Sequence, residues 1–186
     1  MNNIKVRTKL IFVMVVAIAA LVLSVLSSQK SMEQMKENVT AELEADKRAS
    51  YDELIKNEVD SVISLCQQIY KDYQNGTYSL EQAKQIAAVQ IRALRYGDNG
   101  YFWVDQYDGT NVVLLGNSVE GTNRLEAVDG NGNKYIREII KVGQQSGGGY
   151  TDYVYPKEGE TVDSPKRSYS KAFEPFQWVV GTGNYT

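Results

Sequence analysis

Aromatic residues with a polar tip alternate along two segments in the second half of the sequence. Tyr101 and Trp103 stand two positions apart in one segment, and Tyr153 and Tyr155 do the same in another. Residues two apart in an extended strand lie on the same face. A buried tyrosine or tryptophan packs its ring while its hydroxyl or indole N–H seeks a partner. We expect these side chains to line a binding pocket. A wholly apolar core and an exposed aromatic ladder remain alternatives.

Basic residues near these segments are candidates for binding an anion. A carboxylate needs a cation or several convergent donors, and arginine matches it in a bidentate way. Lys166 and Arg167 are neighbours, so in a strand they face opposite sides, with Tyr169 on the side of Arg167. Ordinary solvated surface charge is the alternative for each cation, including Arg124. The predicted ligand-binding residues are Arg95, Tyr101, Trp103, Tyr153, Tyr155, Lys166, Arg167 and Tyr169.

The residue types argue against catalysis. The chain has no histidine, which excludes a Ser-His-Asp triad and most zinc sites. Residues 129–133 resemble the start of a calcium loop, but Lys134 and Ile140 occupy the places that need a glycine and an acid, so we expect a turn. We expect no metal, no cofactor and no enzymatic activity. An extracytoplasmic hydrolase using two carboxylates is the weaker alternative.

The N-terminal segment is typical of a membrane anchor. The run from Leu10 to Leu26 is apolar except for Ser24, and Lys5, Arg7 and Lys9 precede it. Such a run can span a bilayer, and the basic flank places the N-terminus in the cytoplasm. We expect a cytoplasmic tail at 1–9 and a transmembrane helix at 10–28, with the rest of the chain outside the cytoplasm. A cleaved signal peptide is the alternative.

A long helix is expected to follow the anchor. The chain from Lys30 to Tyr73 has neither glycine nor proline and is rich in good helix formers. We expect a membrane-proximal stalk at 29–50 and a separate domain at 51–186. Apolar residues from Ile55 to Tyr73 alternate at spacings of four and three, which predicts a homodimer through this helix. A helix that packs on its own domain is the alternative.

Helical and then strand-like segments follow Asn75-Gly76. Ser79 and Gln82 predict a capping box for a second helix that ends near Arg95. Alternating patterns and turn signals then predict strands, with one short helix at 135–142. The expected strands are 100–106, 111–115, 150–155, 166–173 and 177–182. Helices on one side of an antiparallel sheet of about five strands make an α+β domain. The net charge of -3 gives no basic footprint for nucleic acid.

The second half resembles the single Cache sensor domains of bacterial methyl-accepting chemotaxis receptors. The matching segments, in order, are 95–104, 112–115, 121–123, 129–132, 165–169 and 173–183. The resemblance implies a PAS-like antiparallel sheet with a long N-terminal helix on one face and a ligand pocket on the other. It also implies a small organic ligand, often a short carboxylic acid, and an extracytoplasmic sensor domain at 51–186 in a bacterial inner-membrane protein. The longer protein would add a second membrane helix and a cytoplasmic output module.

One position departs from the family pattern. Many relatives have His-Pro at the end of the second strand, where this chain has Leu115-Gly116. The resemblance therefore leaves the identity of the ligand open. A histidine kinase and a cyclase are the alternatives to a chemoreceptor as the output module.

Overall fold

The computed structural model describes residues 6–185 and divides the chain into two compact units between Ala49 and Ser50. The helix α1 (Val6–Gln74) belongs to both units. Within residues 6–49 its side chains are exposed throughout. Among the described residues, α1 is the one helix long and apolar enough to cross a membrane.

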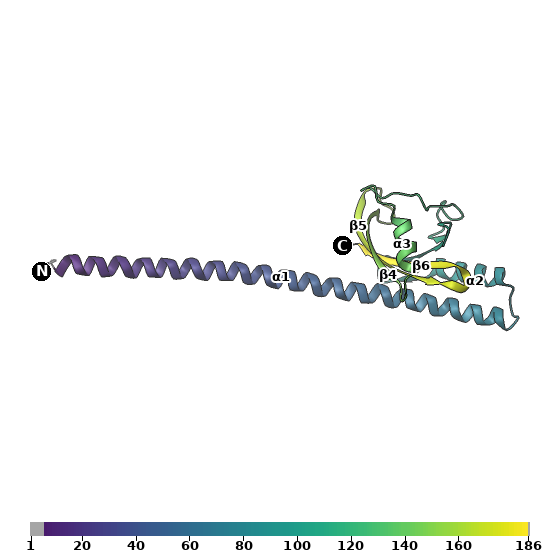
Figure 1. Cartoon of the computed structure of the whole chain (residues 1–186), viewed down its shortest axis with the longest axis horizontal. Helices are drawn as coiled ribbons and strands as arrows, with labels where there is room; N and C mark the ends of the chain where they lie inside the picture. Colours follow the sequence, from purple (N-terminus) through teal and green to yellow (C-terminus); the bar gives the residue numbers. More distant parts are fainter. Residues whose placement is uncertain (1–5, 186) are drawn as a thin grey trace. The chain divides into compact units, whose positions relative to one another are not determined.

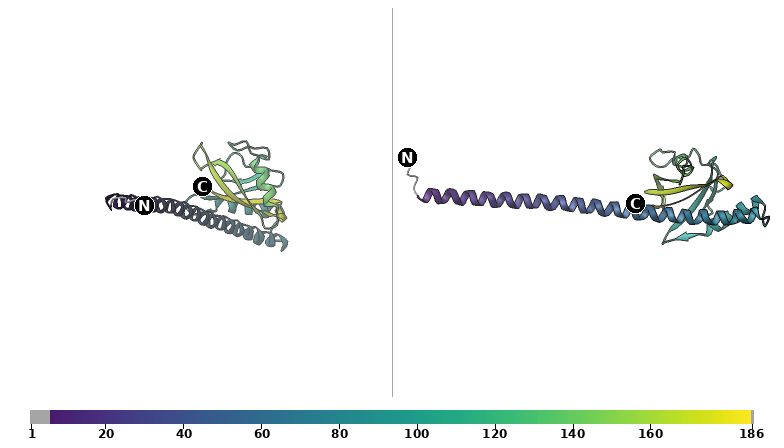
Figure 2. Two further views of the ribbon diagram at one scale, coloured as in Figure 1. Left: turned by 60° about the vertical axis from the view of Figure 1, so that its left-hand side comes forward. Right: turned by 60° about the horizontal axis from the view of Figure 1, so that its bottom comes forward.

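The second unit has three layers. The last part of α1 and the helix α2 (Leu80–Ala93) lie on one side of a sheet, and the helix α3 (Tyr135–Gly143) lies on the other (Figure 1). The two views of Figure 2 show the same layers. The mixed α/β architecture agrees with the α+β fold expected from the sequence.

The sheet is antiparallel and has six strands. Their order is β1-β2-β6-β5-β4, and β3 also pairs with β2. The strands are β1 (Arg95–Tyr96), β2 (Gly100–Gln106), β3 (Asn111–Leu114), β4 (Gly149–Pro156), β5 (Asp163–Phe173) and β6 (Trp178–Tyr185). A 3-10 turn, η1 (Glu174–Phe176), joins β5 to β6. The two-residue β1 was not predicted, because Arg-Tyr is too short to show any alternation.

The core on the helix side uses the apolar seam of α1. Its buried members are Ile55, Val59, Val62, Cys66 and Ile69, and they join a cluster with Phe102 and Val104 of β2. The seam therefore packs on the chain's own domain, which is the alternative that its spacing left open. A homodimer through the stalk helix stays a prediction.

The helix α2 begins as the sequence predicts. Ser79 Oγ accepts a hydrogen bond from the N–H of Gln82, and the Gln82 side chain accepts one from the N–H of Ser79. This reciprocal pair satisfies two backbone donors that a helix start otherwise leaves unpaired. The helix packs Ala83, Ala87 and Ile91 into the same core. The two alanines allow the helix to lie close to the sheet.

Candidate ligand-binding site

A pocket lies between the sheet and α3. The strands supply aromatic walls, α3 covers them, and the loop between β3 and α3 closes one side. The lining residues are Tyr101, Trp103, Leu114, Arg124, Tyr135, Ile136, Ile139, Tyr153, Tyr155 and Lys166. Strand alternation explains the first wall, since Tyr101 and Trp103 face α3 while Phe102 and Val104 face α1 and α2.

The amine of Lys166 lies at the centre of this site. Its side chain is 2% exposed, and Nζ lies 2.7 Å from the hydroxyl oxygen of Tyr101. Strand pairing sets Lys166 between Tyr153 of β4 and Tyr185 of β6. Burial lowers the pKa of Lys166 to about 7, because an ammonium away from water loses its hydration.

Aromatic rings surround the lysine nitrogen. The distances from Nζ to the ring centroids are 4.4 Å for Tyr101, 4.7 Å for Tyr185, 5.2 Å for Trp103 and 5.5 Å for Tyr155. Rings at these distances attract an ammonium through their electron-rich faces. These four rings would therefore stabilise a charged Lys166 once an anion balances its charge.

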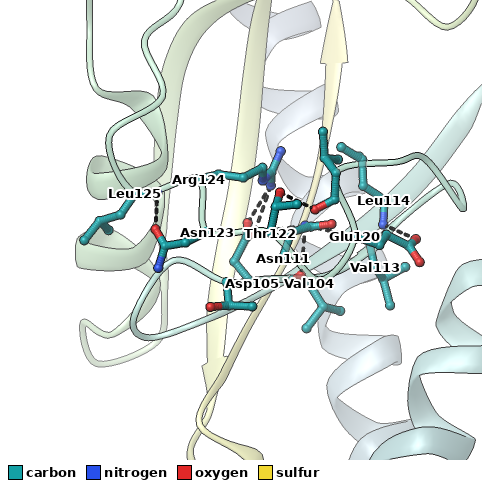
Figure 3. Close-up of polar contacts among 12 residues, drawn as sticks. Val104, Asp105, Asn111, Val113, Leu114, Glu120, Thr122, Asn123, Arg124 and Leu125 are labelled. Atoms are coloured by element: carbon teal, nitrogen blue, oxygen red, sulfur yellow. Dashed lines mark hydrogen bonds and ion pairs between the residues drawn. The ribbon is translucent and has the colours of Figure 1, made fainter.

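The loop that carries Arg124 is held by polar contacts at several points. Nη2 of Arg124 donates to both carboxylate oxygens of Asp105, at 2.8 and 2.9 Å (Figure 3). Nδ2 of Asn111 donates to the same carboxylate at 2.9 Å. Near the start of the loop, the Glu120 carboxylate accepts from the backbone N–H of Leu114 at 2.6 Å. These contacts fix Arg124 at the edge of the pocket.

Asp105 balances the charge of Arg124. The Asp105 side chain is fully buried, and burial raises the pKa of its carboxyl, while Arg124 acts against that rise. The same contact raises the pKa of Arg124 against the effect of its own burial. The two form a neutral pair beside the pocket.

Two N–H groups of the lining residues lack an acceptor. Nε1 of Trp103 and Nε of Arg124 are buried and have no hydrogen-bond partner among residues 6–185. A buried donor without an acceptor is costly and calls for an explanation such as a ligand. With Lys166, these groups offer an entering molecule three donors, which suits an anionic oxygen ligand.

The pocket is narrow. The space in which a water-sized sphere can be centred amounts to about 10 Å³. That is close to the minimum for a single water molecule. A ligand of several atoms therefore requires side chains of the pocket or of α3 to move.

Five of the predicted residues come together in this pocket: Tyr101, Trp103, Tyr153, Tyr155 and Lys166. Arg95 lies elsewhere. It is exposed, and its guanidinium donates to the backbone carbonyls of Arg92 and Leu94 at 2.8 and 2.7 Å.

Arg167 and Tyr169 lie on the helix side of the sheet. Arg167 pairs with Asp52 of α1 at 2.6 Å and stacks on Tyr150, with its guanidinium carbon 4.6 Å from the ring centroid. The hydroxyl of Tyr169 donates to the carbonyl of Gly147. Alternation along β5 sets both residues opposite Lys166, so they cannot share its pocket.

Sequence reasoning missed the contributions of α3 and β3. Tyr135, Ile136 and Ile139 cover the pocket, and Leu114 lines its floor. The helical spacing of the α3 residues was a usable signal, but it did not say which face of the sheet α3 would cover. Leu115 packs against the same apolar cluster with a left-handed φ of 57°. By the resemblance described above, Leu115 and Gly116 stand where many relatives have His-Pro.

The part of the chain that forms this domain is similar to known proteins. The family model described as "Single Cache domain 2" matches residues 47–186. The sensor histidine kinase MctS of Rhizobium johnstonii is 39% identical over 106 residues, which are 56% of this chain and 23% of that protein. The methyl-accepting chemotaxis protein McpP of Pseudomonas putida is 32% identical over 111 residues, 59% of this chain and 20% of that protein.

A solved structure is similar over most of the chain. It is described as "Structural basis for carboxylic acid recognition by a Cache chemosensory domain", with 26% identity and a TM-score of 0.72. The match covers 76% of this chain and 97% of that one. The chain spans less than a quarter of the length of the two curated relatives.

Proposed function

The chain belongs to the single Cache domain 2 family, and from that premise we propose that its pocket binds a short carboxylic acid as the extracytoplasmic sensor of a transmembrane chemoreceptor. One observation carries the proposal. The aromatic pocket brings together the amine of Lys166 and the unpaired N–H groups of Trp103 and Arg124. Each is a donor suited to a carboxylate oxygen. The carboxylic acid recognised by a similar Cache domain supports the same ligand class.

The rest of the chain fits a receptor of this kind. The apolar run from Leu10 to Leu26 would anchor the chain in the membrane, with the domain outside the cytoplasm. Residues 29–50 would form the stalk and pair with a second copy. Ligand binding would favour one of two arrangements of the domain and pass that change along α1. A histidine kinase is the second candidate for the output, because MctS is one.

A thermal-shift titration tests ligand binding. The chain in detergent micelles is titrated with acetate, propionate, lactate and pyruvate, and with acetamide and propionamide as uncharged controls. A ligand that binds the folded state alone stabilises it by about 2.7 kcal/mol at a hundred times its Kd, so the melting temperature rises saturably. We expect the melting temperature to rise with at least one of the acids and not to rise with acetamide or propionamide.

Two variants locate the site. Lys166→Met should abolish the shift, because the pocket loses its cation. Arg95→Ala should keep it, because Arg95 is exposed and bonds its own backbone. Equal shifts with acid and amide, or no shift with any of the four acids, would refute the proposal.

A further inference from the structure

The charge of Lys166 has no counterion in the folded domain. The side chain is 2% exposed, and no carboxylate within residues 6–185 forms an ion pair with it. An ammonium buried without an anion is strongly disfavoured, and a lysine in this position avoids the cost by releasing its proton.

The other charged groups at the pocket do not balance the charge of Lys166. Arg124 lines the same pocket, but Asp105 already balances it through two hydrogen bonds from one nitrogen. With Lys166 neutral, this part of the domain carries no net charge. With Lys166 charged, a second cation would lie among donors and without an anion.

The groups facing the lysine come from every element packed around it. They are Tyr101 of β2, Tyr153 and Tyr155 of β4, Tyr185 of β6, Tyr135 of α3, and Arg124 with its partner Asp105. Burial raises the pKa of the Tyr101, Tyr153 and Tyr185 hydroxyls, and that of Tyr135 to about 12, so these phenols stay protonated near neutral pH. Lys166, whose pKa is lowered to about 7, is placed to change charge near neutral pH.

The contacts of Nζ suit both protonation states. A neutral amine accepts the hydrogen bond of the Tyr101 hydroxyl, and an ammonium donates to the same oxygen across the same 2.7 Å. The rings of Tyr101 and Tyr185 stabilise the ammonium once its charge is balanced. The site can therefore gain a proton without rearranging the lysine.

We propose that Lys166 is uncharged in the ligand-free pocket and takes up a proton from solvent when a carboxylate binds, so that the domain senses the anion together with a proton. The inference rests on the proposed function. A carboxylate supplies the missing negative charge, and the ammonium then pairs with it. The pocket is neutral before binding and neutral again after it.

The proposal fixes how binding depends on pH. Short carboxylic acids are fully ionised above about pH 6, so the ligand itself contributes no proton change there. Where Lys166 is already protonated, binding needs no proton and affinity is flat. At higher pH, where Lys166 is neutral in the free domain, binding of each ligand is coupled to uptake of about one proton from solvent. The affinity then falls about tenfold per pH unit.

Isothermal titration calorimetry on the full chain in detergent measures the proton directly. The probe is whichever of acetate, propionate, lactate and pyruvate binds. Its heat of binding is compared in borate and in Tris at about pH 8.5, since the difference between buffers of unlike ionisation enthalpy gives the number of protons taken up. We expect uptake to approach one proton, and to fall towards zero at about pH 6.

A matched pair of variants assigns the proton. Lys166→Arg keeps a permanent charge, so any remaining binding should show no proton uptake. Lys171→Arg changes a lysine of the same strand that pairs with Asp60 on the opposite face, and uptake should match the wild type. If the arginine variant does not fold, the wild-type titration alone still decides. Binding without proton uptake at about pH 8.5 overturns this inference alone, whereas binding by none of the four acids overturns the proposed function and this inference with it.

Discussion

At the residue scale, the site depends on where single side chains lack a partner. Among the described residues, Trp103 and Arg124 each bury an N–H that finds no acceptor, and Lys166 buries an amine that finds no anion. Such groups reduce the stability of the ligand-free domain. They also make it selective, since an uncharged analogue would supply an acceptor for the N–H groups but no anion to pair with a protonated Lys166.

Burial of Lys166 predicts how stability varies with pH. A lysine whose pKa is about 7 when folded and about 10.4 when unfolded makes the unfolded chain bind more protons between those values. The destabilisation is complete below about pH 7 and is relieved as pH rises. The ligand-free wild type should therefore gain about 2 kcal/mol in free energy of unfolding between pH 7 and pH 9, relative to Lys166→Met.

Chemical denaturation at the two pH values measures this difference. Lys171→Met serves as the control, because it removes a lysine that already has a carboxylate partner, and it should keep the wild-type pH dependence. If wild type and Lys166→Met change in parallel, the lysine is charged throughout, and the burial argument is wrong.

Strand alternation made part of the site predictable from residues. It separated Tyr101 and Trp103 from Phe102 and Val104, and it set Lys166 apart from Arg167. It could not say that Arg167 faces α1, because that depends on which side the helix packs. The exposed position of Arg95 could not be predicted either, because the two-residue strand β1 shows no alternation of polar and apolar residues.

At the element scale, β6 shapes the pocket through a missing side chain. A Cβ added to Gly181 would lie 2.6 Å from two ring carbons of Trp103. The indole therefore lies directly against the backbone of β6, where any other residue would push it. This close approach, and not a turn, explains a glycine in the middle of a strand.

Substitution Gly181→Ala should displace Trp103 towards the pocket. We expect a loss of about 1–3 kcal/mol in free energy of unfolding, as is usual for overpacking, together with weakened carboxylate binding. Denaturant titration and calorimetry measure the two effects.

A compensating variant tests the cause. Trp103→Phe in the Gly181→Ala background shortens the ring and should recover part of the stability, although it removes the indole N–H and so should not restore binding. Equal destabilisation in the single and double variants would mean that the methyl group disturbs the strand itself.

Most elements followed from local pattern. Turn and capping signals such as Ser79 with Gln82 set the start of α2, and the strand β2 was predicted at its observed bounds. The seam of α1 was ambiguous, because spacings of three and four suit both a partner helix and a sheet. The packing of Val59 and Cys66 in the domain core shows that this part of the seam serves the sheet, and pairing through the stalk stays a prediction.

At the scale of the whole molecule, β5 connects the pocket to α1. Lys166 points into the pocket, and its neighbour Arg167 crosses to the helix side and pairs with Asp52. Lys171 makes a second link to Asp60 of α1 at 2.6 Å. A shift of β5 on ligand binding would therefore act on α1 through two ion pairs.

Removing one link should separate binding from its effect on the helix. In Arg167→Ala we expect carboxylate affinity within about twofold of the wild type, because Arg167 lies outside the pocket. We also expect the ligand to protect residues 51–60 of α1 less from hydrogen exchange than it does in the wild type, by at least about threefold. Exchange measured with and without ligand tests this. Equal protection in both proteins would show that α1 responds by another route.

The indole N–H resonances test the central claim most directly. The chain has two tryptophans, Trp103 in the pocket and Trp178 in the core on the helix side. In a titration of the 15N-labelled chain with a binding carboxylate, we predict that the Trp103 resonance moves downfield and saturates as its N–H gains an acceptor, while the Trp178 resonance stays in place. A carboxylate that binds without moving the Trp103 resonance would contradict the account, because the ligand would then lie outside this pocket.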